Sequence, residues 1–185
     1  MKPAVHFRTL TATARAAATG LANIALGRVE LRSDVQLAAG DLAPDFQLSA
    51  SDGRQYKLSD FRGHQAVVIA WFPRAFTPGC TAECRSLGTS EAALRALNAQ
   101  YFAASVDSPA TNAEFARSLQ LPFPILSDET GETARAYGVL SRSGFPFRWT
   151  FYIGLDGRIL DVDRQVRAST HGNDVAARLR ELGIS

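Results

Sequence analysis

The stretch Pro73-Arg74-Ala75-Phe76-Thr77-Pro78-Gly79-Cys80 decides the fold, because it joins an apolar run to a helical pattern. Residues 66–72 (AVVIAWF) are apolar on both faces, as in a central strand that is covered by layers on either side. A helix is predicted to begin near Cys80 and to carry the second cysteine, Cys84. Free N–H groups and the dipole at a helix N-terminus favour negative charge, so we expect a thiol there to shift towards thiolate.

The segments on either side predict an α/β fold, in which a mixed sheet is flanked by helices on both faces. Strands are expected at 46–48, 55–58, 66–72, 101–106, 149–153 and 159–162. Helices are expected at 80–98, 109–119, 132–137 and 174–182. Asn173 is the predicted cap of the last helix, and Asp156-Gly157 predicts a hairpin between the last two strands. Two prolines make 121–124 an extended segment.

Composition indicates one ordinary globular domain and excludes several classes of protein. The chain has 185 residues, of which 46% are hydrophobic and 21% charged. Its net charge is only +2 and no basic tract stands out, so no nucleic-acid partner is expected. Two cysteines do not make a disulfide framework, and no apolar run approaches the length of a membrane span.

The first 39 residues differ from the rest and are predicted to form a helical arm outside a domain at 40–185. The first acidic residue is Glu30, and apolar residues before it recur at spacings of three and four. Threonines and Arg15 interrupt the continuous apolar core that a secretory signal needs. A targeting segment and a disordered tail remain alternatives. We expect a cytoplasmic protein, monomer or dimer, with periplasmic or membrane-surface association left open.

The motif Pro73-x-x-x-Thr77-x-x-Cys80 resembles the active-site signature of peroxiredoxins. The fuller string from Thr77 to Glu83 (TPGCTAE) is similar to the PrxQ, or bacterioferritin-comigratory, branch. Further similar stretches are 43–46 (APDF), 121–128 (LPFPILSD), 137–139 (YGV), 148–151 (RWTF) and 156–157 (DG). The resemblance covers residues 40–163. It implies a thioredoxin-like fold and the reduction of peroxides by thiol chemistry, with no cofactor.

Peroxide chemistry at a thiol needs more than ionisation. A thiolate attacks the weak O–O bond and becomes a sulfenic acid. A free cysteine has a pKa of about 8.5, so complete ionisation at pH 7 gains at most about 30-fold in rate, or ~2 kcal/mol. The rest must come from aligning the peroxide and stabilising the leaving oxygen. Thr77 suits this task because a hydroxyl both donates and accepts hydrogen bonds.

The resemblance assigns the remaining catalytic roles. Arg148 would supply a guanidinium from a strand far along the chain, and a guanidinium is a fixed plane of donors with a permanent charge. Pro73 would shield the sulfur from water, while the backbone near Gly79 would complete the cradle. Glu83 resembles a family position, and we expect it to support the site through a hydrogen bond.

The role of Cys84 is open. PrxQ relatives commonly carry a resolving cysteine five residues after the peroxidatic one, but Cys84 follows Cys80 by four. In a regular helix this spacing puts the Cα atoms about 6 Å apart, close to the limit for a disulfide. The first helical turn would have to loosen before the sulfurs could meet. Either Cys84 resolves and a thioredoxin-like protein reduces the disulfide, or Cys84 is structural and an external thiol reduces Cys80 directly.

Two other functions compete with a peroxidase. Copper-delivery proteins of the Sco type use Cys-x-x-x-Cys with a histidine near the distal strand, but 145–148 (FPFR) contains none. Disulfide oxidoreductases resemble Cys-x-x-Cys proteins with a cis-proline before the distal threonine, whereas Trp149 precedes Thr150 here. The three histidines, His6, His64 and His171, share no ligand spacing and are expected at the surface, so no metal is expected.

Overall fold

The computed structural model describes residues 35–185. The helical arm predicted for residues 1–39 therefore lies outside the described residues, apart from its last five. The boundary between an arm and a domain at residue 40 stays a prediction.

Within the described residues, seven strands form one mixed sheet in the order β2-β1-β5-β4-β3-β6-β7. Their bounds are β1 Gln47–Ala50, β2 Gln55–Lys57, β3 Ala66–Trp71, β4 Ala99–Ser105, β5 Ile125–Ser127, β6 Thr150–Ile153 and β7 Ile159–Asp163. The β3–β4 and β4–β5 pairs are parallel, and the other pairs are antiparallel. This arrangement confirms the predicted mixed sheet and places β3 near its centre.

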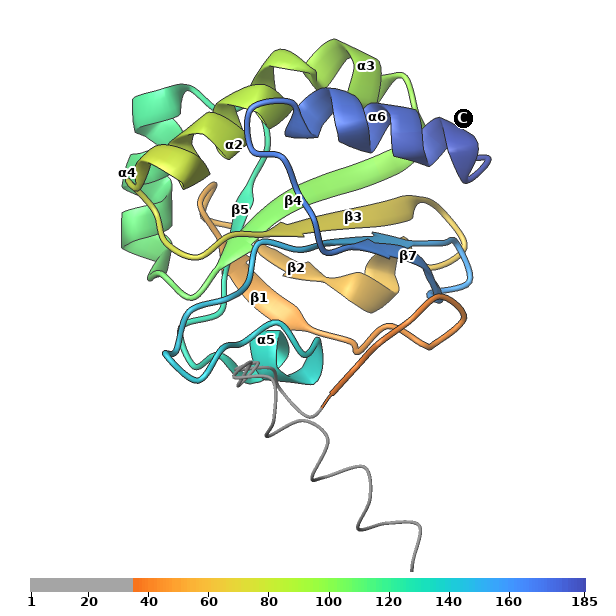
Figure 1. The fold of residues 1–185 in the computed structure, drawn as a ribbon, viewed down its shortest axis with the longest axis horizontal. Helices are drawn as coiled ribbons and strands as arrows, with labels where there is room; N and C mark the ends of the chain where they lie inside the picture. The colour runs from red at the N-terminus through yellow and green to blue at the C-terminus, as the bar shows by residue number, and fades with distance from the viewer. Residues whose placement is uncertain (1–34) are drawn as a thin grey trace, which may run out of the picture. The chain divides into compact units, whose positions relative to one another are not determined.

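Helices cover both faces of the sheet (Figure 1). Their bounds are η1 Leu58–Phe61, α2 Pro78–Thr89, α3 Glu91–Arg95, α4 Pro109–Leu119, α5 Glu132–Ala136 and α6 His171–Glu181. Alternate residues of β3 divide the core into two layers. Val68 and Ala70 pack with α2, α3, α4 and α6, whereas Ile69 and Trp71 pack with η1 and α5. The all-apolar sequence of β3 follows from this burial on both faces.

The structure corrects three predictions about the elements. The helix expected over 80–98 is two helices, which meet at the buried residue Ser90. Strand β5 follows directly after the extended 121–124 segment and was not predicted. The last helix begins at His171, so Asn173 lies inside it and does not cap it. The side chain of Asn173 instead accepts a hydrogen bond from Ser90 Oγ (3.1 Å), which joins α6 to the α2–α3 junction.

Candidate active site

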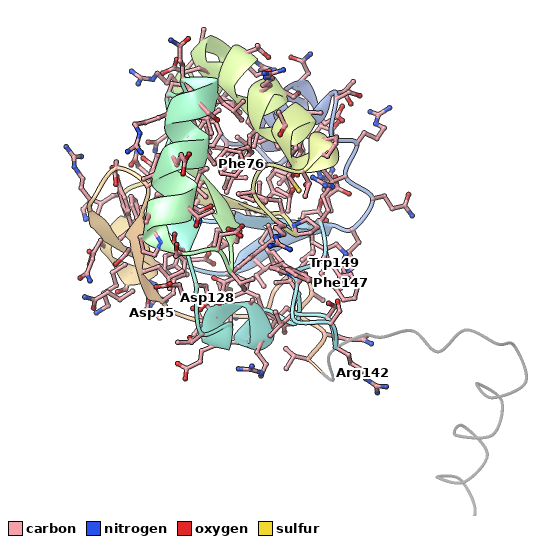
Figure 2. The ribbon with its side chains drawn as sticks, turned by 90° about the vertical axis from the view of Figure 1, so that its left-hand side faces the viewer. Asp45, Phe76, Asp128, Arg142, Phe147 and Trp149 are labelled. Carbon is pink, nitrogen blue, oxygen red and sulfur yellow. The ribbon has the colours of Figure 1, made fainter. Side chains whose placement is uncertain are left out.

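The loop after β3 is held in place by contacts to β4 and α4. The Phe72 N–H donates to the Ala104 carbonyl (2.9 Å), and the Ala75 N–H donates to Asp107 Oδ2 (2.8 Å). Phe76 has a left-handed backbone (φ 62°), which costs about 1–2 kcal/mol for a residue with a side chain. Its ring packs against Phe115, with centroids 5.0 Å apart, and remains 51% exposed beside the start of α2 (Figure 2).

This loop delivers Cys80 to the first turn of α2. Thr77 is the extended residue that precedes the helix, and Pro78 occupies its first position, where a missing N–H costs nothing. Cys80 is only 1% exposed, but its sulfur meets a cation: Arg148 Nη2 lies 3.3 Å from Sγ. The site therefore lies at the carboxyl end of a central strand, with the sulfur at a helix N-terminus and against a guanidinium.

Arg148 is fixed by its neighbours at the start of β6. The Trp71 N–H, at the end of β3, donates to the carbonyl of Trp149 (2.8 Å). The Trp149 ring stacks on Phe147, with ring centroids 5.3 Å apart, and the Arg164 guanidinium lies over the Trp149 ring at 4.9 Å. Phe147 and Trp149 are labelled next to each other in Figure 2. The residues on both sides of Arg148 are thus held in place by packing and hydrogen bonding, which fixes the backbone from which the guanidinium extends to α2.

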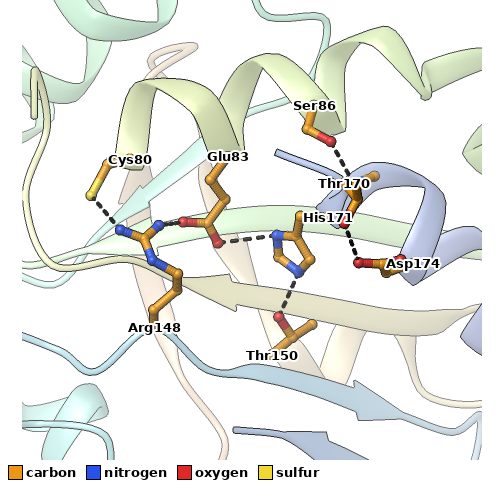
Figure 3. A network of polar contacts seen from close by, with 9 residues as sticks. Cys80, Glu83, Ser86, Arg148, Thr150, Thr170, His171 and Asp174 are labelled. Atoms are coloured by element: carbon orange, nitrogen blue, oxygen red, sulfur yellow. Dashed lines mark hydrogen bonds and ion pairs between the residues drawn. The ribbon is translucent and has the colours of Figure 1, made fainter. Parts of the chain in front are cut away.

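Glu83 connects Arg148 to the interior of the protein (Figure 3). It follows Cys80 by three residues in α2 and is only 1% exposed. Its Oε2 forms an ion pair with Arg148 Nη1. Its Oε1 lies 3.0 Å from His171 Nδ1, although the alignment is not that of a regular hydrogen bond. Neither of these two atoms has another polar partner among residues 35–185. Glu83 thus contacts the guanidinium that lies against the Cys80 sulfur.

The prediction that His171 lies at the surface was wrong. Its side chain is completely buried, and its Nε2 lies 2.8 Å from Thr150 Oγ1. The error came from the predicted start of the last helix. With the helix beginning at His171, the spacing His171, Val175, Leu179 places the histidine on the apolar face, and this pattern was available in the sequence.

Burial lowers the pKa of His171 to about 4. Asp163 and Asp174 oppose this shift, and Arg148 adds to it. The imidazole is therefore neutral near pH 7, with one nitrogen that donates and one that accepts. A carboxylate only accepts, so the proton belongs on Nδ1, facing Glu83. Nε2 then accepts a hydrogen bond from the Thr150 hydroxyl.

Cys84 lies one turn beyond Cys80 on the apolar side of α2 and is completely buried. Burial raises the pKa of the Cys84 thiol, and the nearby Cys80 raises it further. Both cysteines are free in this structure. Cys84 is therefore a protonated thiol in this conformation, and it cannot act as a nucleophile until this part of α2 opens.

The part of α2 beyond Cys84 is anchored to the start of α6. The Gly172 N–H donates to Ser86 Oγ (3.0 Å). A Cβ atom at Gly172 would lie 2.2 Å from the Ser86 carbonyl oxygen, so only glycine permits this approach. Ser90 adds its hydrogen bond to Asn173. The part of α2 from Ser86 onward is therefore tied to α6.

The remaining predicted site residues lie in the loop before α2 and in the first turn of this helix. Gly79 faces Arg148, because a Cβ at this position would stand 3.2 Å from Nη2. Thr77 is half-buried, and its hydroxyl donates to the carbonyl of Arg74 (3.0 Å), which leaves the oxygen free to accept. Pro73 is half-buried in the same loop.

Two further observations concern metals and membranes. The His, Cys, Asp and Glu side chains of residues 35–185 form no group of three or more that could hold a metal ion. Within the same residues, every helix is too short or too polar to cross a bilayer.

Comparison with known proteins identifies the family. The AhpC/TSA family matches residues 39–162. The chain is 34% identical to peroxiredoxin Bcp of Escherichia coli K12 over 152 residues, which are 78% of this chain and 97% of that protein. It is 29% identical to peroxiredoxin Bcp of Bacillus subtilis over 150 residues, 77% of this chain and 95% of that protein.

Solved structures that superpose on this chain belong to the same family. Peroxidoxin BcpB of Mycobacterium tuberculosis superposes with a TM-score of 0.72 at 30% identity, covering 79% of this chain and 98% of that one. A variant of Xylella fastidiosa PrxQ superposes with a TM-score of 0.74 at 25% identity, covering 80% of this chain and 99% of that one. The bacterioferritin comigratory protein of Xanthomonas campestris superposes with a TM-score of 0.69 at 26% identity, covering 80% of this chain and 98% of that one. That structure is described for the alkyl peroxide reduction activity of the protein. The chain belongs to the AhpC/TSA family and, within it, to the PrxQ/Bcp peroxiredoxins, which makes it a thioredoxin-fold, thiol-dependent peroxidase.

Proposed function

We propose that Cys80 is the peroxidatic cysteine, that Arg148 and Thr77 align the peroxide, and that Cys84 resolves the oxidised sulfur. The observation that carries the proposal is the guanidinium of Arg148, which lies 3.3 Å from the Cys80 sulfur while it is paired with the buried Glu83. A cation held in this way stabilises negative charge on sulfur and on an oxygen beside it.

In the first step the Cys80 thiolate attacks the terminal oxygen of the peroxide. The S–O bond forms as the O–O bond breaks, and the alkoxide or hydroxide that leaves takes up a proton. Charge moves from sulfur to the leaving oxygen, and the two Nη atoms of Arg148 provide donors along this path. The Thr77 oxygen can accept a hydrogen bond from the peroxide O–H, because its own hydrogen is used by Arg74. Pro73 and the Gly79 backbone complete the walls of the site.

In the second step the Cys84 thiolate attacks the sulfur of the Cys80 sulfenic acid. A disulfide forms, and hydroxide leaves as water after taking up a proton. Because Cys84 is buried and protonated, residues 78–84 must first unwind while Ser86 stays on α6. An external dithiol, for which we propose a thioredoxin-like protein, returns two electrons and two protons.

Both hydrogen peroxide and organic hydroperoxides are proposed substrates. The half-exposed ring of Phe76 beside the start of α2 offers an apolar surface for an alkyl group. The activity named for the Xanthomonas campestris relative is in keeping with this choice. We further propose that residues 40–185 are the peroxidase domain, which functions in the cytoplasm as a monomer or a dimer.

Peroxide consumption with thioredoxin and its reductase tests the proposal. The wild type should turn over, and Cys80→Ser should not. Arg148→Lys keeps the charge but loses the planar, two-point contact, so we expect its oxidation to slow by about 10- to 100-fold. Arg142→Lys, at an exposed arginine of the same segment, is the matched control and should match the wild type. Equal rates for the two lysine variants would overturn the role of Arg148.

The rival readings make different predictions in the same experiment. A one-cysteine enzyme would turn over with a small thiol and would keep its rate in Cys84→Ser. A copper-binding module would bind copper stoichiometrically in its reduced form, although Arg148 places a positive charge against the sulfur that would ligate the metal. A disulfide oxidoreductase would reduce insulin without consuming peroxide.

A further inference from the structure

We infer that His171 is a positioning residue for the oxidation of Cys80. Its imidazole holds the carboxylate of Glu83, and this carboxylate holds the guanidinium of Arg148 against the sulfur. The inference rests on the proposed role of Arg148.

The geometry forms a continuous path from the interior to the sulfur (Figure 3). Thr150 Oγ1 lies 2.8 Å from His171 Nε2, and His171 Nδ1 lies 3.0 Å from Glu83 Oε1. The other carboxylate oxygen of Glu83 pairs with Arg148, whose Nη2 reaches Cys80. Three elements, β6, α6 and α2, supply the members of this path other than Arg148, which lies just before β6.

His171 determines where the Glu83 carboxylate points. Oε1 of Glu83 lies 3.0 Å from His171 Nδ1, without the alignment of a regular hydrogen bond, and has no other polar partner within residues 35–185. The Glu83 side chain is only 1% exposed, so the imidazole is the polar group that faces this oxygen. An unpartnered buried carboxylate oxygen is costly, which favours rotation of Glu83 if His171 is removed. Rotation would turn Oε2 away from Arg148. The guanidinium would then lose the contact that fixes it beside the sulfur.

A neutral imidazole suits this role better than a charged one. A protonated His171 would compete with Arg148 for the single negative charge of Glu83. The charged groups around the imidazole are Glu83 of α2, Arg148 before β6, Asp163 of β7 and Asp174 of α6. Burial outweighs the two aspartates and keeps the ring neutral. Because a carboxylate can only accept a hydrogen bond, the proton of the neutral ring is placed on Nδ1, which faces Glu83.

The test separates the two ring nitrogens. His171→Asn retains an N–H donor close to the position of Nδ1, and His171→Gln retains a polar group close to the position of Nε2. His171→Leu removes both. Stopped-flow oxidation of the reduced protein by hydrogen peroxide gives the rate for Cys80, and the thermal midpoint gives the stability of each variant. His64→Asn, at an exposed histidine, is the matched control.

We expect His171→Asn to oxidise close to the wild-type rate, and His171→Gln and His171→Leu to oxidise about 10- to 100-fold more slowly. His171→Asn and His171→Gln should lower the thermal midpoint similarly, because each loses one contact of the same buried ring. If the rates depended only on stability, these two variants would therefore oxidise at the same rate. Equal oxidation rates for His171→Asn and His171→Gln, whether fast or slow, would overturn the inference. This comparison stands even if the Leu variant does not fold.

A double-mutant cycle tests the path through Glu83. In a Glu83→Gln background, His171→Gln should cause no further slowing, because the carboxylate that it positions is gone. A full additional loss would overturn the inference. Arg148→Lys separates the two levels of the proposal. If this variant is as fast as the wild type, the proposed function fails together with the inference. If it is slow while His171→Gln is fast, only the role of His171 fails.

Discussion

Ala82→Gly should speed the formation of the disulfide between Cys80 and Cys84. Ala82 lies between the two cysteines in α2, in the part of the helix that must unwind. Glycine in a helix interior is less stable than alanine by about 1 kcal/mol. The substitution destabilises the helical state but not the unwound state, so the free energy of unwinding falls by about 1 kcal/mol. Because 1.36 kcal/mol corresponds to a factor of ten, the population of the unwound state should rise about fivefold. If chemistry follows a rapid unwinding equilibrium, the disulfide should form about fivefold faster.

The assay follows two phases in a single turnover. Rapid mixing with one equivalent of hydrogen peroxide gives a first phase for sulfenic acid and a second for the disulfide, which quenching and mass analysis separate. Ala92→Gly is the matched control, because Ala92 is an exposed residue of α3, outside the segment that unwinds. Urea unfolding should show a similar loss of stability in both variants, about 1 kcal/mol.

The two variants together can refute this reasoning. An unchanged second phase in Ala82→Gly would mean that unwinding of α2 does not control the disulfide. An equal acceleration in Ala92→Gly would show that general loss of stability, and not local unwinding between the cysteines, is responsible.

Two further predictions follow from α6. The pKa of His171 is about 4 in the folded protein and 6.5 in the unfolded chain, so the unfolded state binds the extra proton as the pH falls through this window. Stability should therefore drop by about 3 kcal/mol more in the wild type than in His171→Asn between pH 7 and pH 4, which urea titrations measure; equal slopes would contradict a buried neutral ring. Gly172→Ala would place a Cβ 2.2 Å from the Ser86 carbonyl oxygen and should destabilise the protein by about 1–3 kcal/mol in urea unfolding. An unchanged midpoint would show that α2 and α6 separate freely.

The sequence predicted the sheet and its central strand because long apolar runs and turn signals are local. The run at 66–72 needs burial on both faces, and β3 has it. Strand β5 was missed because it has only three residues and follows a proline, which leaves too little pattern to recognise. The break at Ser90 depends on a contact with Asn173 of α6, and no local signal reports such a contact.

The arrangement of the candidate site was predictable in part for the same reason. A cysteine at the start of a helix is a local feature, so Cys80 stood out at once. Arg148 lies 68 residues away, and only a family resemblance could connect it with Cys80. His171 was missed because Asn173 looked like the better helix cap, which removed the histidine from the helix. Its spacing to Val175 and Leu179 would have placed it on the buried face.

Intact mass and free-thiol count, before and after one equivalent of hydrogen peroxide, test the central claim most directly. The wild type should lose both thiols and two hydrogens in mass, as a disulfide requires. Cys84→Ser should lose one thiol and gain one oxygen, as a sulfenic acid requires. Sulfenic acid in both proteins would contradict the resolving role of Cys84 and leave a one-cysteine enzyme. If neither protein were oxidised within minutes at micromolar peroxide, Cys80 would not be the peroxidatic cysteine.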